Sequence, residues 1–476
     1  MMPSTLNASA DMPGGMSSRR TADLLQRYDR PGPRYTSYPT AIDFTERFDE
    51  HAYRGRLRAA ASAAGEPLSL YVHLPFCEAR CTYCGCMTIV TRKRDVAARY
   101  LEYLEREIAM LAAELEGRRR IVQHHWGGGT PTYLTSTQIE RLHGVVARHF
   151  DIDPDAEMAI EIDPRVTSRE QLQLLRSLGF NRLSMGVQDF TPEVQEAIGR
   201  TQSEALTRDL YEHARTIGFE AINMDLIYGL PRQTVETFTR TLSSVVGMRP
   251  DRIAVYSYAH VPWLRPHQSR IDTADLPGRD LKFDLIAAAI ETFGDAGYAA
   301  IGMDHFALPG DELAIAARER RLHRNFMGYT TRPAADMVGV GVSAISDLRG
   351  AFAQNLKKLP PYYAAIDAGR FPIERGYALT DDDLIRRYVI SELMCNFFVD
   401  RATVTERFGV DFGAYFACEL GALTAPDGPV SDGFLNVTAT ALDVPPAGRL
   451  FVRSICMHFD RYLATHSGRP VFSRTI

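Results

Sequence analysis

Short apolar runs alternate with amphipathic stretches along most of the chain after residue 50. The runs occur at 68–74, 121–126, 158–162, 182–187, 221–227 and 252–258. Between the first two runs, Leu101, Leu104, Ile108, Leu111 and Leu115 recur at the three- and four-residue spacing of one helix face. The same periodicity predicts helices at 95–117, 167–178, 203–217, 234–246 and 280–293. Strands that alternate with amphipathic helices predict parallel βα units.

The predicted helix at 167–178 carries its own start and stop signals. Thr167 and Glu170 have the spacing of a capping box, in which each side-chain oxygen accepts a hydrogen bond from the other residue's backbone N–H. Gly179 follows directly and is a typical helix stop.

Polar residues collect where the predicted strands end. Such segments are the cysteine-rich loop after residue 76, the glycine run 127–131, and the segments 161–164, 188–189, 225–231 and 259–260. Barrels of parallel strands assemble their sites from these carboxyl ends. An open doubly wound sheet fits the βα rhythm too, but six units are fewer than the eight of a full barrel. We therefore expect an α/β fold with a partial (β/α)6 TIM-like barrel.

The rhythm disappears after about residue 350, which suggests three parts. We expect a disordered tail and an arm at 1–51, a barrel at 52–355, and a mainly helical C-terminal domain at 356–476. Pro360-Pro361 lies close to the second boundary, and 381–397 is a strong helix. No chemical motif stands out in the last part, so it is interpreted as a cap or lid.

Composition narrows the classes of partner. The chain has 476 residues, a net charge of −5 and a pI near 6.2, which argues against a general binder of nucleic acid or anionic membranes. Arg118–Arg120 is the densest basic run and is expected to be a solvated helix end. Five arginines between Arg19 and Arg34 form either a surface arm or a contact with an anionic ligand. No signal peptide and no apolar run of about 18 residues is evident, which favours the cytoplasm.

Four of the seven cysteines lie within ten residues, and three of them form a C-x3-C-x2-C spacing at Cys77, Cys81 and Cys84. Zinc sites and ferredoxin clusters usually take four protein ligands, but no second Cys-x2-Cys or His-x3-His unit follows. We expect a [4Fe–4S] cluster on three cysteines, with one iron open to a ligand. The alternatives are a structural metal site with Cys86 as fourth ligand, and a disulfide. Three isolated thiols, Cys395, Cys418 and Cys456, are expected to be packed.

Glycines and acids at the strand ends are further candidates. The run Gly127–Gly129 is either a tight turn or a place where backbone approaches an amino or carboxylate group of a ligand. Glu161, Asp163 and Asp225 suit acid/base chemistry or hydrogen bonds to ribose and ammonium groups, but also helix capping. The glycine-rich stretch 339–347 is either a ligand loop or a strand with close backbone packing.

Taken together, these motifs resemble the radical S-adenosylmethionine superfamily, and within it the oxygen-independent coproporphyrinogen III oxidase (dehydrogenase) family. The longer motifs are 27–40 (RYDRPGPRYTSYPT), 71–77 (YVHLPFC), 84–86 (CGC), 126–131 (WGGGTP), 185–189 (MGVQD) and 225–231 (DLIYGLP). The resemblance covers nearly the whole chain from about residue 20.

The resemblance implies a [4Fe–4S] cluster on Cys77, Cys81 and Cys84, with S-adenosylmethionine on the open iron. It places Tyr71, Gly128, Glu161 and Ile345 around this first S-adenosylmethionine. It places a second S-adenosylmethionine among Tyr83, Gly129, Thr130, Gln188, Arg200, Asp225 and Ala259. The implied reaction uses a 5′-deoxyadenosyl radical to decarboxylate two propionates of coproporphyrinogen III to vinyl groups, giving protoporphyrinogen IX in anaerobic haem biosynthesis.

Partners and one residue role follow from the same resemblance. We expect a monomer that receives electrons from a small flavodoxin- or ferredoxin-type protein, and arginines of the arm or Arg165 that meet the substrate carboxylates. Cys86 is expected to be a catalytic thiol that handles a proton or electron, or else a small buried hydrophobe. Related haem-binding chaperones have Asp-Phe where this chain has Gly85-Cys86, and they lack the arm. RNA-modifying radical enzymes would be more basic.

Overall fold

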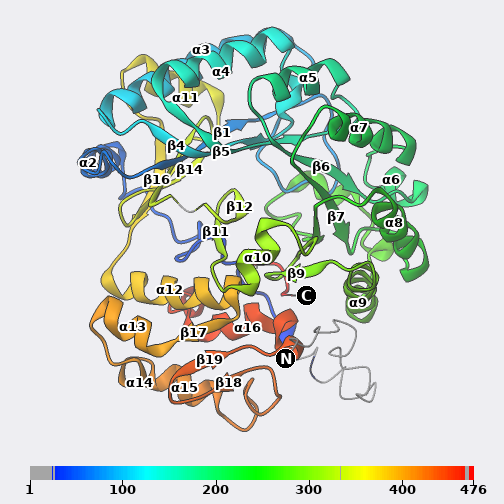
Figure 1. Ribbon diagram of the computed structural model, residues 1–476, viewed down its shortest axis with the longest axis vertical. Coiled ribbons are helices and arrows are strands. Elements are labelled where there is room, and N and C mark those ends of the chain that lie inside the picture. Colours follow the sequence, from blue (N-terminus) through cyan, green and yellow to red (C-terminus); the bar gives the residue numbers. More distant parts are fainter. Residues whose placement is uncertain (1–23, 25–26, 333, 467–470, 476) are drawn as a thin grey trace.

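A single curved sheet of twelve strands organises most of the protein (Figure 1). The structure, a computed structural model, describes residues 24, 27–332, 334–466 and 471–475. The expected tail, with Arg19 and Arg20, lies outside them. No helix in this described portion is long and apolar enough to cross a membrane.

Seven parallel strands form the centre of the sheet, in the order β13-β1-β4-β5-β6-β7-β8. Their bounds are β1 Leu68–Leu74, β4 Arg120–Gly128, β5 Asp151–Ile162, β6 Arg182–Gln188, β7 Ala221–Tyr228, β8 Arg252–Ser257 and β13 Asp336–Val340. All six predicted strands are confirmed, and each lies beside the next along the chain. The glycine-rich stretch 339–347 begins in the seventh strand, β13, passes through a turn and ends in the short strand at Ile345–Asp347. A Cβ on Gly339 would lie 2.6 Å from the carbonyl oxygen of Ile345.

Short antiparallel strands extend both edges and were not predicted. One edge adds β14 Ile345–Asp347, β15 Ala351–Asn355 and β16 Ile373–Ala378, and the other adds β10 His305–Ala307 and β9 Ala299–Ile301. Three of them, β9, β10 and β14, have only three residues each, too few to show an alternating pattern. Two separate pairs are β2 Phe76–Cys77 with β3 Ile89–Val90, and β11 His323–Asn325 with β12 Gly328–Thr330.

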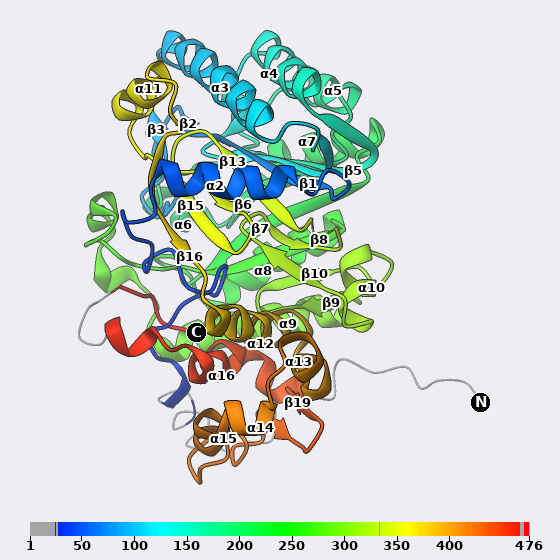
Figure 2. The same ribbon diagram turned by 90° about the vertical axis from the view of Figure 1, so that its left-hand side faces the viewer.

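Helices cover the outer side of the curved sheet (Figures 1 and 2). They are α2 Glu50–Ala61, α3 Arg94–Glu114, α4 Ser136–His149, α5 Arg169–Ser177, α6 Pro192–Ala197, α7 Glu204–Thr216, α8 Val235–Met248, α9 Arg279–Asp295 and α11 Leu359–Asp367. A further helix, α10 Glu312–Arg318, lies instead at the amino-terminal ends of β6 and β8. The five predicted helices are confirmed as α3, α5, α7, α8 and α9. The predicted capping box is wrong by one residue. Ser168 and Gln171 form it, because the Thr167 hydroxyl donates to the carbonyl of Asp163 instead.

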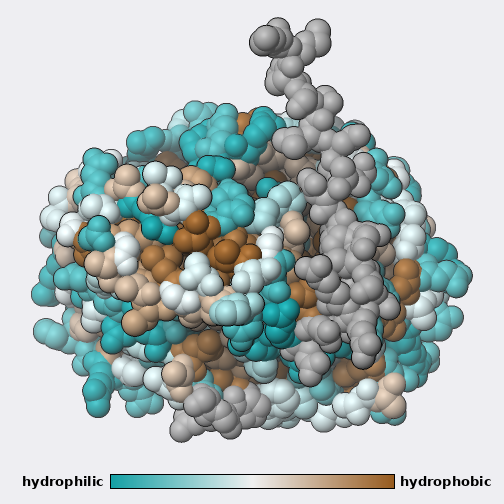
Figure 3. Space-filling model, turned by 90° about the horizontal axis from the view of Figure 1, so that it is seen from below, coloured by the Kyte–Doolittle hydropathy of each residue, from teal (hydrophilic) through white to brown (hydrophobic). Residues whose placement is uncertain are grey.

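The C-terminal part forms a second core below the sheet (Figure 2). It contains α12 Asp381–Asn396, α13 Arg401–Phe408, α14 Phe412–Tyr415, α15 Ala417–Leu423 and α16 Val452–Cys456, with a small sheet of β17 Phe398–Asp400, β19 Ala441–Asp443 and β18 Asn436–Val437. Figure 3 shows this side of the molecule, where apolar surface is confined to small patches. The strand β16 lies beyond the expected boundary at residue 355 but still belongs to the large sheet. We therefore propose that the C-terminal domain begins after β16, at α12.

The N-terminal arm is part of this second core. Tyr28, Tyr35 and Tyr38 are buried within it. The buried guanidinium of Arg453 donates to the arm carbonyls of Gly32, at 2.6 Å, and Pro33, at 3.0 Å. The arm is therefore folded against the C-terminal part.

Two expectations about single residues are corrected. Arg118 is fully buried and is ion-paired with Asp336 at 2.5 Å, so it is not a solvated helix end. Its guanidinium also donates to three backbone carbonyls, which satisfies a cation that burial would otherwise penalise. Cys395 and Cys456 are buried as expected, but Cys418 is exposed.

Glu107 of α3 is a buried carboxyl that joins three elements. It accepts hydrogen bonds from Tyr362, at 2.5 Å, Asn355, at 2.6 Å, and the backbone of Gly341, at 2.8 Å. Burial raises its pKa to about 7, although these hydrogen bonds lower it. The folded state therefore holds this proton more tightly than the unfolded chain does. Its contribution to stability is greatest below the unfolded pKa, about 4.3, and is lost as pH rises to about 7.

We predict that Glu107→Gln flattens the pH dependence of stability. Between pH 5 and 8 the wild-type free energy of unfolding should fall by up to about 3 kcal/mol more than that of the variant. Denaturant unfolding at several pH values measures this difference. Glu102→Gln, on the exposed face of the same helix, is the control, and equal pH profiles for wild type and Glu107→Gln would contradict the assignment.

Candidate functional site

A cavity of about 1140 Å³ opens at the carboxyl ends of the parallel strands. The cysteine loop forms one wall, strands β4 to β8 form the floor, and the arm, β16 and Val471 complete the rim. Of the predicted site residues, it is lined by Cys77, Cys81, Tyr83, Cys84, Cys86, Gly128, Gly129, Thr130, Glu161, Gln188, Arg200, Asp225 and Ala259. Residues from seven separate segments thus meet at one place, as barrel topology predicts.

Tyr71 and Ile345 do not line the cavity. The Tyr71 ring stacks on His125 with centroids 5.9 Å apart, and its hydroxyl is 3.0 Å from Nδ1 of His73. Ile345 belongs to β14, and its backbone lies against Gly339, which pairs with Tyr71 in the sheet. Both residues therefore lie beside the site, on strands β1 and β14, with β13 between them.

The cysteine loop is held by donors from other segments. Three side chains of segment 265–268 contact three successive carbonyls of the loop. Gln268 Nε2 lies 2.8 Å from the Tyr83 carbonyl, His267 Nε2 lies 2.7 Å from that of Cys84, and Arg265 Nε lies 2.9 Å from that of Gly85. On the other side, the backbone N–H of Thr82 donates to Ile198, and His73 Nε2 is 3.1 Å from the Met87 carbonyl. Sequence reasoning missed segment 265–268, because it has neither periodicity nor a familiar motif.

The three thiols differ in their surroundings. Cys77 Sγ lies 3.7 Å from the Thr130 hydroxyl, and burial raises the pKa of Cys77 to about 11. Cys81 Sγ is 3.7 Å from Arg165 Nη2 and 3.9 Å from Arg200 Nη1. Hydrogen bonding from Cys86 lowers the pKa of Cys84 to about 6. Cys84 is therefore largely ionised near neutral pH, whereas binding of a metal cluster would release the proton of Cys77.

The donor set fits a cubane cluster. All three thiols are free and line one cavity. No three His, Cys, Asp or Glu side chains in the described ranges are grouped to hold a single metal ion. A [4Fe–4S] cluster binds each thiolate through a different iron, so its ligands need not converge on one point.

The glycine run makes room for protein groups. A Cβ on Gly127 would lie 2.7 Å from the Glu161 carboxylate, and one on Gly129 would lie 2.6 Å from the Pro75 carbonyl carbon. Gly128 has φ +116° and donates its N–H to Glu161 at 3.0 Å. The run thus lets β4 pass directly beneath the cysteine loop, and the Gly128 N–H that a ligand could use is already occupied.

The environments of the predicted acids shift their pKa values in different directions. Burial raises the pKa of Glu161, but hydrogen bonds from His125, at 3.3 Å, and from Gly128 outweigh it and hold that pKa below its usual value. Burial raises the pKa of Asp225 to about 6, while Ser184 and Asn223 donate to its two oxygens. Neither acid caps a helix.

Asp163 has a structural task. Its carboxylate accepts from Arg165 at 2.6 Å and from Arg200 at 2.9 Å. Arg200 also donates to the carbonyl of Gly186. Both guanidinium groups are oriented in this way, and Arg165 is committed to Asp163 rather than open to a substrate carboxylate.

Three further cations line the rim opposite the cysteine loop, and only Arg34 was anticipated. Arg34, from the arm, donates to the carbonyl of Ser257 at 2.7 Å, and Arg375 of β16 donates through Nε to Gln354 at 2.8 Å. Lys357 is paired with Glu374 at 2.6 Å. Arg375 and Lys357 lie beyond residue 355, in the part of the sequence where no chemical motif was visible.

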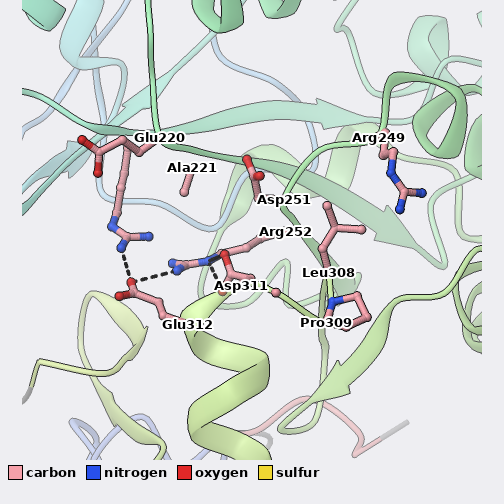
Figure 4. A pocket seen from close by; sticks show the side chains of 11 residues that line it. Glu220, Ala221, Arg249, Asp251, Arg252, Leu308, Pro309, Asp311 and Glu312 are labelled. Carbon is pink, nitrogen blue, oxygen red and sulfur yellow. Dashed lines mark hydrogen bonds and ion pairs between the residues drawn. The ribbon is translucent and has the colours of Figure 1, made fainter. Parts of the chain in front are cut away.

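A second hollow lies at the opposite, amino-terminal ends of β6 to β8 (Figure 4). Arg252 reaches Asp311, at 2.9 Å, and Glu312, at 3.1 Å, while Arg182 also contacts Glu312. These charges neutralise one another, so this hollow is an ion-pair cluster between barrel and α10.

Comparison with known proteins agrees with this site. The Radical SAM superfamily model matches residues 71–245, and the HemN C-terminal domain model matches residues 379–451. Curated relatives described as oxygen-independent coproporphyrinogen III oxidases include those of Escherichia coli K12 (49% identical, covering 95% of this chain and 98% of the relative) and Synechocystis (43%, 96% and 98%). The solved coproporphyrinogen III oxidase of Escherichia coli, titled a radical SAM enzyme, aligns with a TM-score of 0.88 at 48% identity, covering 93% and 99% of the two chains.

A curved parallel sheet with a three-cysteine loop at its carboxyl ends defines a protein of the radical S-adenosylmethionine superfamily. The cofactors of this class are a [4Fe–4S] cluster and S-adenosylmethionine. More narrowly, the chain belongs to the oxygen-independent coproporphyrinogen III oxidase family. The resemblance and the partial-barrel fold are confirmed, and the haem-chaperone alternative is not favoured.

We predict that Gly129→Ala lowers the iron content of the protein. The added Cβ would lie within 2.7 Å of backbone atoms of Pro75 and Phe76, which cannot move without shifting the cysteine loop. Iron analysis after anaerobic reconstitution should show a loss of about half or more. Gly144→Ala in α4 has no neighbour closer than 3.9 Å and should keep its iron, and equal iron in both variants would contradict the prediction.

Proposed function

We propose that this chain converts two propionates of coproporphyrinogen III to vinyl groups by oxidative decarboxylation, giving protoporphyrinogen IX. The observation that carries the proposal is the three-cysteine loop facing a cationic rim across one large cavity. The substrate presents four carboxylates, which such a rim suits. When bound, the cluster and S-adenosylmethionine supply one electron and a carbon radical able to remove hydrogen from the propionate β-carbon.

The chain's own residues bind and orient these groups. Cys77, Cys81 and Cys84 hold the cluster. Tyr71, Gly128, Glu161 and Ile345 border the first S-adenosylmethionine. Tyr83, Gly129, Thr130, Gln188, Arg200, Asp225 and Ala259 border a second one, and their common place on the cavity supports this assignment.

The rim cations receive substrate carboxylates. Arg34 and Arg375 each have guanidinium N–H groups besides those used in the bonds to Ser257 and Gln354. Ala41 and Ile42 of the arm line the same rim and cover apolar parts of the ligand. The arm thus closes one side of the substrate site.

The setting of the reaction follows from the same proposal. The protein works in the cytoplasm as a monomer, takes electrons from a small flavodoxin- or ferredoxin-type protein, and needs neither nucleic acid nor membrane. The absence of a spanning helix within the described ranges and the small, scattered apolar patches are compatible with this setting.

Cys84 and Cys86 give a matched pair of variants that tests the function. Cys84→Ser should lose the cluster, as should Cys77→Ser and Cys81→Ser. Cys86 lines the cavity and hydrogen-bonds to Cys84, but it lies outside the C-x3-C-x2-C spacing. Cys86→Ser should therefore keep iron and S-adenosylmethionine cleavage while losing decarboxylation. An anaerobic assay that follows vinyl products by mass, beside iron analysis, separates these results.

Either of two results would change the assignment. Loss of iron in Cys86→Ser would make Cys86 a ligand, and full activity would make it a packing residue. Wild-type protein with a full cluster and no vinyl product would overturn the proposed function itself.

We further predict that Arg34→Met raises KM for coproporphyrinogen III by about 10- to 100-fold, as expected for a lost charged hydrogen bond. Iron content and S-adenosylmethionine cleavage should not change. Arg30→Met, exposed on the same arm outside the cavity, is the control. Removing the whole arm is a poorer test, because Tyr28, Tyr35 and Tyr38 belong to the second core. An unchanged KM in Arg34→Met would show that Arg34 has only a structural role.

A further inference from the structure

A basic surface surrounds the outer side of the cysteine loop. Between residues 78 and 99 the sequence has two acids, Glu78 and Asp95, and five cations, Arg80, Arg92, Lys93, Arg94 and Arg99. Glu78 is paired with Arg94, which leaves four cations, all exposed, against one acid. The chain as a whole carries a net charge of −5, so this surface is opposite in sign to the rest of the protein.

Helix stability does not explain these cations. Arg92, Lys93 and Arg94 lie at the amino end of α3, where the helix dipole is positive and favours acidic side chains. Arg94 is compensated by Glu78 and the Tyr133 carbonyl. The side chains of Arg92 and Lys93 are exposed and make no hydrogen bond or ion pair with any described residue. Such an arrangement costs the helix stability and points to an external partner.

Exposed apolar side chains lie next to the same loop. Six large hydrophobic residues in the described ranges are exposed: Ile42, Val90, Leu206, Val235, Trp263 and Leu264. Val90 pairs with Cys77 between β3 and β2. Trp263, 51% exposed, precedes Arg265, whose side chain is bonded to Gly85. A few exposed apolar groups within a charged surround are typical of transient protein interfaces.

We infer that this loop surface, formed by Val90, Lys93, Arg99 and Trp263, docks a small acidic protein that carries a one-electron redox centre. The inference rests on the proposed function, which consumes electrons at the cluster. In the transfer, the carrier is oxidised by one electron and the cluster is reduced by one.

Position and charge both support this partner. Val90 is paired with the cluster residue Cys77, so a protein bound here approaches the cluster closely. Lys93, Arg99 and Trp263 do not line the cavity, so they are not needed for the tetrapyrrole. Electron-transfer complexes have small interfaces and depend on charge steering for their association, which an acidic carrier and this surface would provide.

The test uses the cluster-loaded enzyme and a flavodoxin with its flavin reduced to the hydroquinone. Stopped-flow absorbance gives the rate constant for cluster reduction, and calorimetry with oxidised flavodoxin gives Kd. The test variant is Lys93→Glu with Arg99→Glu. The control is Arg240→Glu on α8, an exposed arginine on a different side of the barrel (Figure 1). Dithionite, which needs no docking surface, serves as the second reductant.

We expect the double variant to be reduced by flavodoxin about tenfold or more slowly than the control, with weaker binding and a smaller salt dependence. Reduction by dithionite and iron content should match wild type. Trp263→Ser should weaken binding while leaving the salt dependence unchanged. If the double variant loses iron, Lys93→Gln alone replaces it, with a smaller loss expected.

Three results would overturn the inference: equal flavodoxin rates in the double variant and the control, an equal slowing with dithionite, or a wild-type flavodoxin rate that does not respond to salt. Turnover of coproporphyrinogen III with dithionite tests the proposed function alone. The docking surface and the proposed function can therefore fail separately.

Discussion

The placement of the cysteine loop is the constraint on which the rest of the site depends. A loop without regular structure of its own has to satisfy its carbonyls with donors from elsewhere. Here Arg265, His267 and Gln268 supply three of these contacts from one side. Gly129 lets β4 pass underneath at a distance that no side chain would permit. A loop held in this way presents three thiols to one cavity before any cluster is bound.

Local sequence patterns were sufficient for the parallel strands and the long helices, since each of these is long enough to show its period. The cluster ligands were also visible, because all three lie on one short segment. The parts of the site built by distant contacts were not visible. The pairing of Arg200 with Asp163, the support from segment 265–268 and the rim residue Arg375 each depend on which segments the fold brings together. Three-residue strands at the sheet edges and the shifted capping box were missed because neighbouring hydrogen bonds decided them.

Charge inside the cavity is arranged in layers. At the floor, Asp163 binds the guanidinium groups of Arg165 and Arg200 and fixes their orientation. Above it, His125 and the Gly128 N–H keep the Glu161 carboxylate ionised. At the rim, Arg34 of the arm and Arg375 of β16 keep guanidinium N–H groups that no group of the described residues uses. A ligand with both an ammonium group and carboxylates therefore meets acids near the floor and cations at the edge, which favours one orientation over the reverse.

The two sides of the cysteine loop differ in how their charged groups are compensated. Its inner side faces the cavity, where every charged group near the thiols has a protein partner or lines the ligand space. Its outer side carries Lys93 at a helix end that disfavours a cation, although Arg94 beside it is fully compensated. An uncompensated cation at the amino end of a helix does not stabilise the folded protein. Cations kept at a stability cost, next to a redox centre and on the surface of an acidic chain, are best explained by attraction of a partner of opposite charge.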